Sequence, residues 1–120
     1  MTVFADTSAV VKIYVDEPSS SRVRSLEAMY VADLTRVELP AALWRKSRTG
    51  ALDRKACGAL VRRFEQELDR AAGILVPVLV GRDALRRAAD LTGMHRLRAY
   101  DAVQLSVAMG VAEADSSCRT

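Results

Sequence analysis

The feature that most limits the fold of this chain is an uninterrupted apolar run, Ile-Leu-Val-Pro-Val, at residues 74–78. An unbroken run of this length is typical of a strand that is buried on both faces, as the strands of parallel sheets are. Shorter runs of β-type residues occur at 2–5 and 30–32, and segments with helical patterns lie between the runs. Strands that alternate with helices predict an α/β fold, with three α/β/α layers and a small parallel sheet.

Apolar residues at helical spacing predict the helices that cover this sheet. Met29 continues the apolar stripe of the second helix. Thr35 and Glu38 have the form of a capping box at the start of the third. Because a proline is comfortable only in the first turn of a helix, Pro40 leaves that start open between Thr35 and Glu38. The predicted helices span residues 9–15, 19–29, 35–46, 53–71, 82–91 and 100–112.

Length and composition agree with one domain, which we expect to span residues 1–120. Half of the 120 residues are apolar, which is enough for a core without disulfides or structural metals. Cys57 and Cys118 are too few and too far apart for a disulfide scaffold or a zinc site, which predicts a reduced, cytoplasmic protein. No stretch approaches the ~18 apolar residues that cross a bilayer, so we expect neither export nor a membrane span.

Asp6 is the first candidate functional residue, because it directly follows the apolar run at the start of the chain. In an open α/β sheet, ligands bind outside the carboxyl ends of the strands, where this carboxylate would lie. The simpler interpretation is that Asp6 caps the helix that follows, and for Asp6 alone the cap is favoured. Only further acids in equivalent positions favour a ligand-binding role.

Two such acids occur, Glu38 between Val37 and Leu39, and Asp101 before Ala102. Each has its own structural explanation, since Glu38 can complete a capping box and Asp101 suits the positive end of a helix dipole. Taken together, the three acids are better explained by a shared site. Helices that follow parallel strands begin at the same edge of the sheet, so the three carboxylates would face one another there. Like charges that converge favour a bound divalent cation.

The residue types around these acids limit which metal ion could bind and which reaction it could support. Ligands that are all oxygen suit Mg²⁺ or Mn²⁺, whereas zinc prefers histidine or cysteine. His95 is the only histidine, has no motif around it, and is predicted to be a surface residue. Carboxylates around a metal ion hydrolyse phosphodiesters by activating water, and they need no side-chain nucleophile. The hydroxyls of Thr7 and Ser8 could form hydrogen bonds with an acid, a metal-bound water or a phosphate. They are equally well explained as groups that cap the helix.

The formal charge of +3 permits a polyanionic partner without requiring one. Basic residues come in short groups, and most such groups form solvated helix faces. Two groups lie close in sequence to the acids and could steer a nucleic-acid backbone towards them. These groups are Arg45, Lys46 and Arg48 after Glu38, and Arg96 and Arg98 before Asp101.

Three segments resemble the motifs of PIN-domain ribonucleases, specifically the VapC-type toxins of type II toxin–antitoxin modules. They are Asp-Thr-Ser-Ala-Val-Val-Lys at 6–12, Thr-Arg-Val-Glu-Leu at 35–39 and Leu-Arg-Ala-Tyr-Asp-Ala-Val-Gln-Leu at 97–105. The resemblance implies a PIN-like fold and a Mg²⁺-dependent (or Mn²⁺-dependent) endoribonuclease with Asp6, Glu38 and Asp101 as catalytic, metal-binding acids. It also implies an RNA substrate, a homodimer and inhibition by a VapB-type antitoxin.

The end of the chain departs from that family pattern. The family has a further acid just after a final strand, in a segment resembling Phe-Val-x-Phe-Asp, and no such segment occurs before Thr120. Asp115 precedes the expected position and is a poor substitute. We therefore expect a member truncated at its C-terminus, without the final strand, and the sequence leaves open whether such a chain keeps its activity.

Two alternatives to the nuclease stay open at this stage. One is a catalytically impaired PIN-like domain that still binds an antitoxin. The other is a receiver-like signalling domain with an acidic pocket. Receivers carry adjacent acids after the first strand and a lysine on a late strand, whereas here Thr7 follows Asp6 and residues 74–78 contain no lysine.

Overall fold

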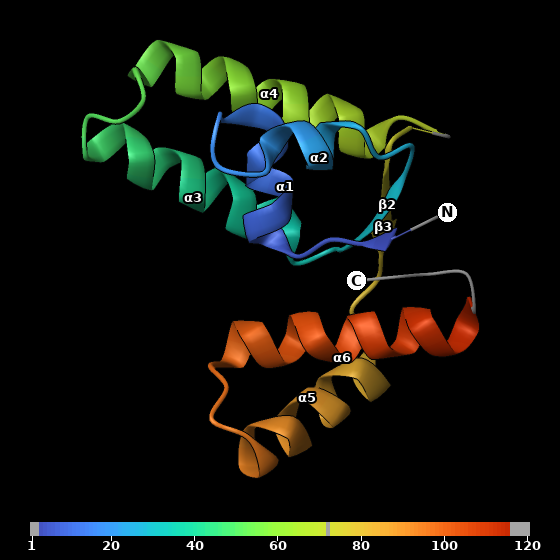
Figure 1. The fold of residues 1–120 in the computed structure, drawn as a ribbon. Coiled ribbons are helices and arrows are strands. Elements are labelled where there is room, and N and C mark those ends of the chain that lie inside the picture. Colours follow the sequence, from blue (N-terminus) through green and yellow to red (C-terminus); the bar gives the residue numbers. More distant parts are fainter. Residues whose placement is uncertain (1–2, 72, 116–120) are drawn as a thin grey trace.

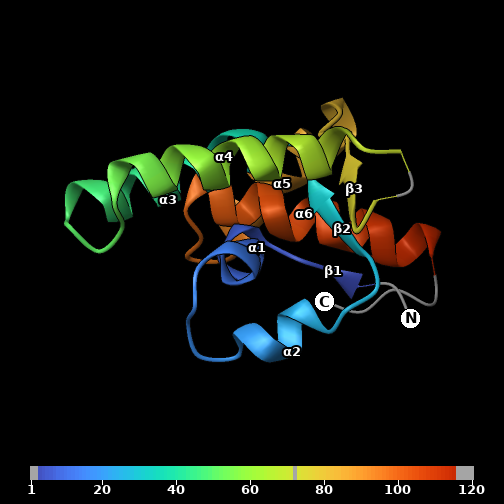
Figure 2. The same cartoon turned by 90° about the horizontal axis from the view of Figure 1, so that it is seen from above.

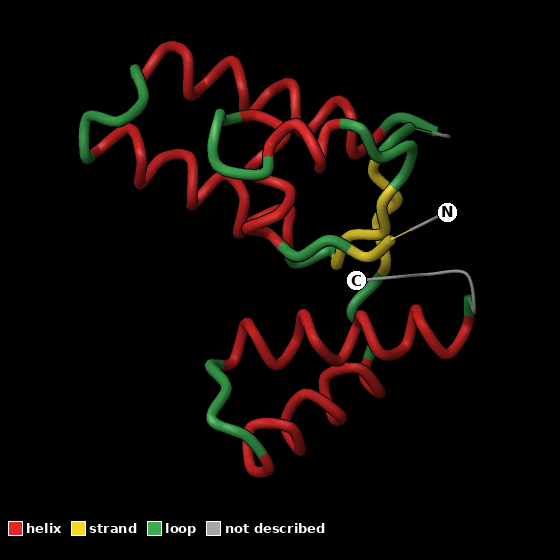
Figure 3. Tube along the Cα trace, viewed as in Figure 1, coloured by secondary structure: helices red, strands yellow, loops and turns green. Residues whose placement is uncertain are grey.

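A computed structural model describes residues 3–71 and 73–115 of the chain. Its strands alternate with helices, as Figures 1 and 3 show. The strands are β1 (Val3–Phe4), β2 (Met29–Ala32) and β3 (Leu75–Val78). The helices are α1 (Thr7–Tyr14), α2 (Ser20–Arg24), α3 (Thr35–Arg48), α4 (Arg54–Asp69), α5 (Arg82–Met94) and α6 (Ala99–Ala114).

The described strands form one parallel sheet in the order β1-β2-β3. Val3 pairs with Met29, which in turn pairs with Leu75. Helices α1 to α4 lie on one side of the sheet, and α5 and α6 lie on the other (Figures 1 and 2). This confirms the predicted three-layer α/β/α class with a small parallel sheet.

Two apolar cores lie on opposite faces of the sheet. The larger core fills the space between the sheet and α1, α3 and α4, and Phe64 and Leu39 are fully buried in it. Phe64 meets the ring of Tyr14 edge to face, with 5.9 Å between the ring centroids. The smaller core joins Phe4 and Ala32 to Val107 on α6. The sheet is therefore covered on both faces, as parallel strands require.

The second and third helices differ from the prediction at their ends. Helix α2 is only five residues long, and Met29 begins β2 instead of continuing the helix. Helix α3 already begins at Thr35, and Pro40 lies inside it. The expected capping box does not form, because Leu34 occupies the N-cap without a side-chain hydrogen bond. The hydroxyl of Thr35 bonds to side chains from other helices instead.

Two later segments also differ in detail. Helix α4 ends at Asp69, earlier than the predicted residue 71. In β3, Leu75 is buried but Pro77 is exposed, because this strand pairs only with β2 within the described sheet. Proline is compatible with such a position, since its missing N–H is not needed for a second neighbour. The predicted C-terminal features at 116–120 lie outside the described residues.

None of the helices in the described part of the chain is long and apolar enough to cross a membrane.

The packing around Phe64 predicts a large effect on stability. Phe64→Ala should lower the free energy of unfolding by about 3–5 kcal/mol, because it leaves a cavity in the larger core. Leu85→Ala, which truncates a side chain that is 51% exposed on α5, should change it by less than about 0.5 kcal/mol. Urea titrations followed by circular dichroism measure both values. Equal losses for the two variants would contradict the assignment of the core.

Candidate active site

Asp6 lies between the end of β1 and the start of α1. Its Oδ1 accepts hydrogen bonds from the backbone N–H of Ala9 at 3.0 Å and from the hydroxyl of Ser8 at 2.9 Å. Asp6 therefore caps α1, as the simpler interpretation predicts. Oδ2 makes no hydrogen bond to any described residue, and the side chain is exposed. One carboxylate oxygen is thus used by the fold, while the other is available to a ligand.

Glu38 lies in the first turn of α3 and shows the same division between its two oxygens. Its Oε1 accepts hydrogen bonds from Thr7 Oγ1 at 3.0 Å and from Gln104 Nε2 at 2.8 Å. Oε2 has no hydrogen-bond donor within the described part of the chain. The carboxylate is therefore oriented by two neighbouring helices and still has a free oxygen.

Asp101 lies in the first turn of α6, where the helix dipole favours a negative charge. Its side chain is exposed, and the structure gives it no hydrogen bond or ion pair to a described residue. Both of its carboxylate oxygens are thus available to a ligand.

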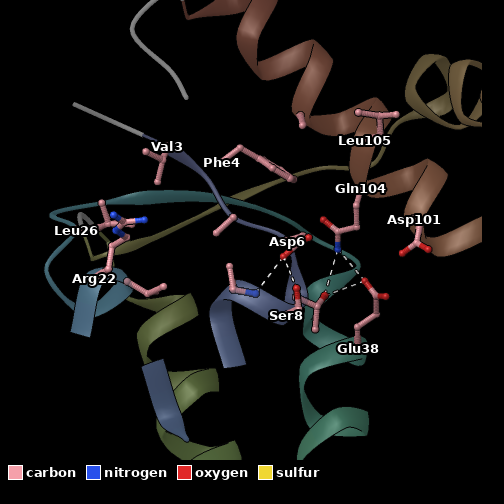
Figure 4. Close-up of a pocket in the computed structure, with 15 residues that line it drawn as sticks. Val3, Phe4, Asp6, Ser8, Arg22, Leu26, Glu38, Asp101, Gln104 and Leu105 are labelled. Carbon is pink, nitrogen blue, oxygen red and sulfur yellow. Dashed lines mark hydrogen bonds between the residues drawn. The ribbon is translucent and has the colours of Figure 1, made fainter. Parts of the chain in front are cut away.

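All three predicted acids line one open cavity of about 600 Å³, which we call the acidic cavity. Asp6 enters it from the end of β1, Glu38 from α3 and Asp101 from α6 (Figure 4). The same cavity continues along β1, past Val3 and Phe4. The folded chain therefore brings together, at one edge of the sheet, acids as far apart in the sequence as Asp6 and Asp101.

The donor set of the acidic cavity has the chemistry that Mg²⁺ and Mn²⁺ prefer, because the available donors are carboxylate oxygens. The three acids do not converge on one point, however. Among residues 3–71 and 73–115, no group of three or more His, Cys, Asp or Glu side chains is close enough to hold a metal ion. The residue types thus fit a divalent cation, whereas the spacing in this structure is wider than in an assembled metal centre.

Gln104 is central to this site, although the sequence pattern indicates no role for it. Its Nε2 lies within hydrogen-bond distance of Thr7 Oγ1 (3.2 Å), Thr35 Oγ1 (3.2 Å) and Glu38 Oε1 (2.8 Å). These partners belong to α1 and α3, so one side chain on α6 links three helices (Figure 4). The available signal was a polar residue three positions after Asp101, on the same face of a largely apolar helix.

The side-chain carbonyl of Gln104 lacks a hydrogen bond, unlike the other buried side-chain polar groups of the described residues. Oε1 is buried and has no partner among the described residues. A buried acceptor without a donor destabilises a fold by about 1–3 kcal/mol. Such groups call for an explanation, and functional sites are one of the places where they persist.

The other candidates lie away from the acids. His95 is exposed at the end of α5, as predicted. Asp115 accepts a hydrogen bond from the hydroxyl of Tyr30 at 3.2 Å and does not line the acidic cavity. Cys57 and Tyr14 belong to the larger core, where burial raises the pKa of the thiol and of the phenol. None of these side chains is in a position to act on a ligand of the acidic cavity.

A second cavity of about 540 Å³ lies beside the acidic cavity and shares Thr7, Ser8 and Glu38 with it. Arg45 and Lys46 line this second cavity, and Lys46 forms an ion pair with Glu17 at 3.3 Å. Two members of the first predicted basic group, Arg45 and Lys46, therefore lie next to the acids, whereas its third member, Arg48, lines neither cavity. Arg96 and Arg98 are exposed and line neither cavity.

A model of the family described as "PIN domain" matches residues 3–114 of the chain. No curated protein matches it.

The geometry at Asp6 predicts that its capping role can be separated from any role of its charge. Asp6→Asn keeps an oxygen that can accept from Ala9 N–H, so the free energy of unfolding should change by less than about 0.5 kcal/mol. Asp6→Ala removes the cap and should lower it by about 1 kcal/mol. Thermal and urea denaturation of both variants measure the difference. A loss from Asp6→Asn as large as that from Asp6→Ala would contradict the capping interpretation.

Proposed function

The chain belongs to the PIN domain family, a nuclease-type fold, and we propose that it is a metal-dependent endoribonuclease that hydrolyses RNA phosphodiester bonds. The observation that carries this proposal is the meeting of Asp6, Glu38 and Asp101 at one cavity from three different elements. Each of these acids has at least one carboxylate oxygen without a partner among the described residues. In this proposal the three acids are the catalytic residues and hold Mg²⁺ or Mn²⁺.

When bound, the cation would lower the pKa of water and neutralise charge on the phosphate. The chain itself orients the acids. The cap on α1 fixes the direction of Asp6, and two hydrogen bonds fix that of Glu38. No hydrogen bond to a described residue fixes the Asp101 carboxylate, so its side chain is the most able to turn towards a ligand. The wide spacing of the acids in this structure is consistent with a site that closes around its ligand.

The second cavity offers a path for the RNA strand. Arg45 and Lys46 place two cations beside Glu38, and Glu17 offsets part of that charge through its ion pair with Lys46. Arg45 makes no ion pair to a described residue, and its side chain is exposed. We therefore propose Arg45 as the side chain that contacts the phosphates next to the scissile bond.

The biological role that the sequence motifs favour is that of a VapC-type toxin in the cytoplasm. In this role the chain would form a homodimer and be held inactive by a VapB-type antitoxin. A second candidate is a catalytically impaired domain that keeps only the antitoxin-binding role. The acids of the described residues are not gathered into a metal-binding group, and this spacing is compatible with either candidate. Nothing observed favours a receiver-like domain.

The proposal predicts that the purified chain cleaves single-stranded RNA with Mg²⁺ or Mn²⁺ and loses this activity with EDTA. Asp6→Asn and Asp101→Asn should each lower the cleavage rate by about 100-fold or more, since the loss of even an outer partner of a metal site lowers activity by about 10- to 100-fold. Gel assays with labelled RNA measure these rates.

The matched control is Asp90→Asn, which removes an exposed acid of α5 that lines neither cavity. This variant should cleave RNA at the wild-type rate. Wild-type rates in Asp6→Asn and Asp101→Asn would rule out the proposed acids. A wild-type chain that stays inactive with Mn²⁺ but binds an antitoxin would identify the impaired domain instead.

The position of Arg45 predicts a change in the salt dependence of RNA binding. In EDTA, where no cleavage occurs, Arg45→Ala should weaken binding and reduce the slope of log Kd against log salt concentration by about 0.7, the value for one phosphate contact on a single strand. Arg86→Ala, which removes an exposed cation that lines neither cavity, should leave the slope unchanged. Fluorescence anisotropy at several salt concentrations measures both slopes. Identical slopes for the two variants would exclude Arg45 from the binding path.

A further inference from the structure

We propose that Gln104 is a positioning residue, which orients the Glu38 carboxylate and holds Asp101 in place relative to Asp6 and Glu38. This inference rests on the proposed nuclease function, because it assigns to Gln104 a role in assembling the same acidic site. Gln104 is neutral, is only 7% exposed and lines the acidic cavity.

The hydrogen bonds around Gln104 can be assigned by counting protons. The single proton of the Thr7 hydroxyl goes to Glu38 Oε1, so in the contact between Thr7 and Thr35 at 3.3 Å it is Thr35 that donates. Both hydroxyl protons are then used, and the remaining donor is the amide of Gln104, which has two protons. Its shortest contact, 2.8 Å, is to the charged Glu38, as expected for a charge-assisted hydrogen bond.

This arrangement fixes the direction of the Gln104 amide. The opposite orientation would place its carbonyl against the Glu38 carboxylate, where neither oxygen carries a proton. The observed orientation leaves Gln104 Oε1 buried without a donor. The fold thus accepts an unpaired carbonyl at the wall of the acidic cavity in order to keep the amide nitrogen on Glu38.

Gln104 also controls where Asp101 lies. The two residues are three positions apart on α6, so they share one face of the helix. Elsewhere, α6 is held by apolar packing against α5 and β2, by a hydrogen bond from Ser106 to the backbone of Ala84 and by an ion pair between Arg87 on α5 and Glu113. Among the described residues, every side-chain hydrogen bond between α6 and α1 or α3 is made by Gln104. Loss of the amide would leave the Asp101 end of α6 without a polar link to the other two acids.

The test uses Gln104→Met, which keeps a long unbranched side chain and removes the amide. Mn²⁺ binding, measured by electron paramagnetic resonance, should weaken about 10- to 100-fold, the usual range for an outer partner of a metal site. The kcat for RNA cleavage should fall in the same range, while the KM for RNA changes little. Thr7→Val removes one hydroxyl of the same network and should give the same pattern with a smaller effect, and it serves as the test if Gln104→Met does not fold.

Ser106→Ala is the matched control, because it removes the hydrogen bond of a residue that is also buried and also on α6 but faces α5. It should lower the melting temperature and leave the affinity for Mn²⁺ and the kcat unchanged. Wild-type affinity for Mn²⁺ and wild-type kcat in Gln104→Met or Thr7→Val would overturn the role of Gln104 while leaving the nuclease proposal intact. A wild-type chain that binds no Mn²⁺ and cleaves no RNA would overturn both.

Discussion

The parallel pairing of β1 with β2 determines where Asp6, Thr7 and Glu38 of the acidic cavity lie. Because both strands run in the same direction, the helices that follow them begin at the same edge of the sheet, α1 at Thr7 and α3 at Thr35. The two threonine hydroxyls meet there at 3.3 Å, although 28 positions separate them in the sequence. Glu38, one turn further along α3, then reaches the hydroxyl of Thr7. An antiparallel pairing would send the two helices to opposite edges, and this contact could not form.

The helix on the other face of the sheet joins this arrangement in a different way. Apolar side chains hold α6 against β1, β2 and α5, and such packing fixes the distance of a helix from a sheet better than its position along the strands. Hydrogen bonds from Gln104 supply the directional restraint, because they require the amide to face Glu38. The position of Asp101 at the cavity thus depends on the hydrogen bonds of one polar side chain between two largely apolar layers.

The sequence predicted those features that local interactions decide. Asp6 caps its helix as the simpler interpretation expects, because the backbone N–H group that it accepts from lies three residues away. Met29 was misassigned, since its spacing suits a helical stripe while pairing with Val3 and Leu75 makes it a strand residue. The capping box at Thr35 failed for the same reason, because the hydroxyl is used by residues far away in the chain. Gln104 had no local signal of comparable strength, as its partners lie 66 to 97 positions away.

Comparison of Asp6 with Asp53 shows that capping and ligand binding are compatible roles. Both residues accept the N–H of the residue three positions later through one oxygen, at 3.0 and 3.1 Å. Asp53 caps α4 and lines neither the acidic nor the second cavity. Asp6 differs in its surroundings, because its second oxygen lies at the edge of the sheet where Glu38 and Asp101 also present free oxygens. The cap immobilises the carboxylate and leaves that oxygen available, so the structural role prepares Asp6 for a ligand instead of competing with one.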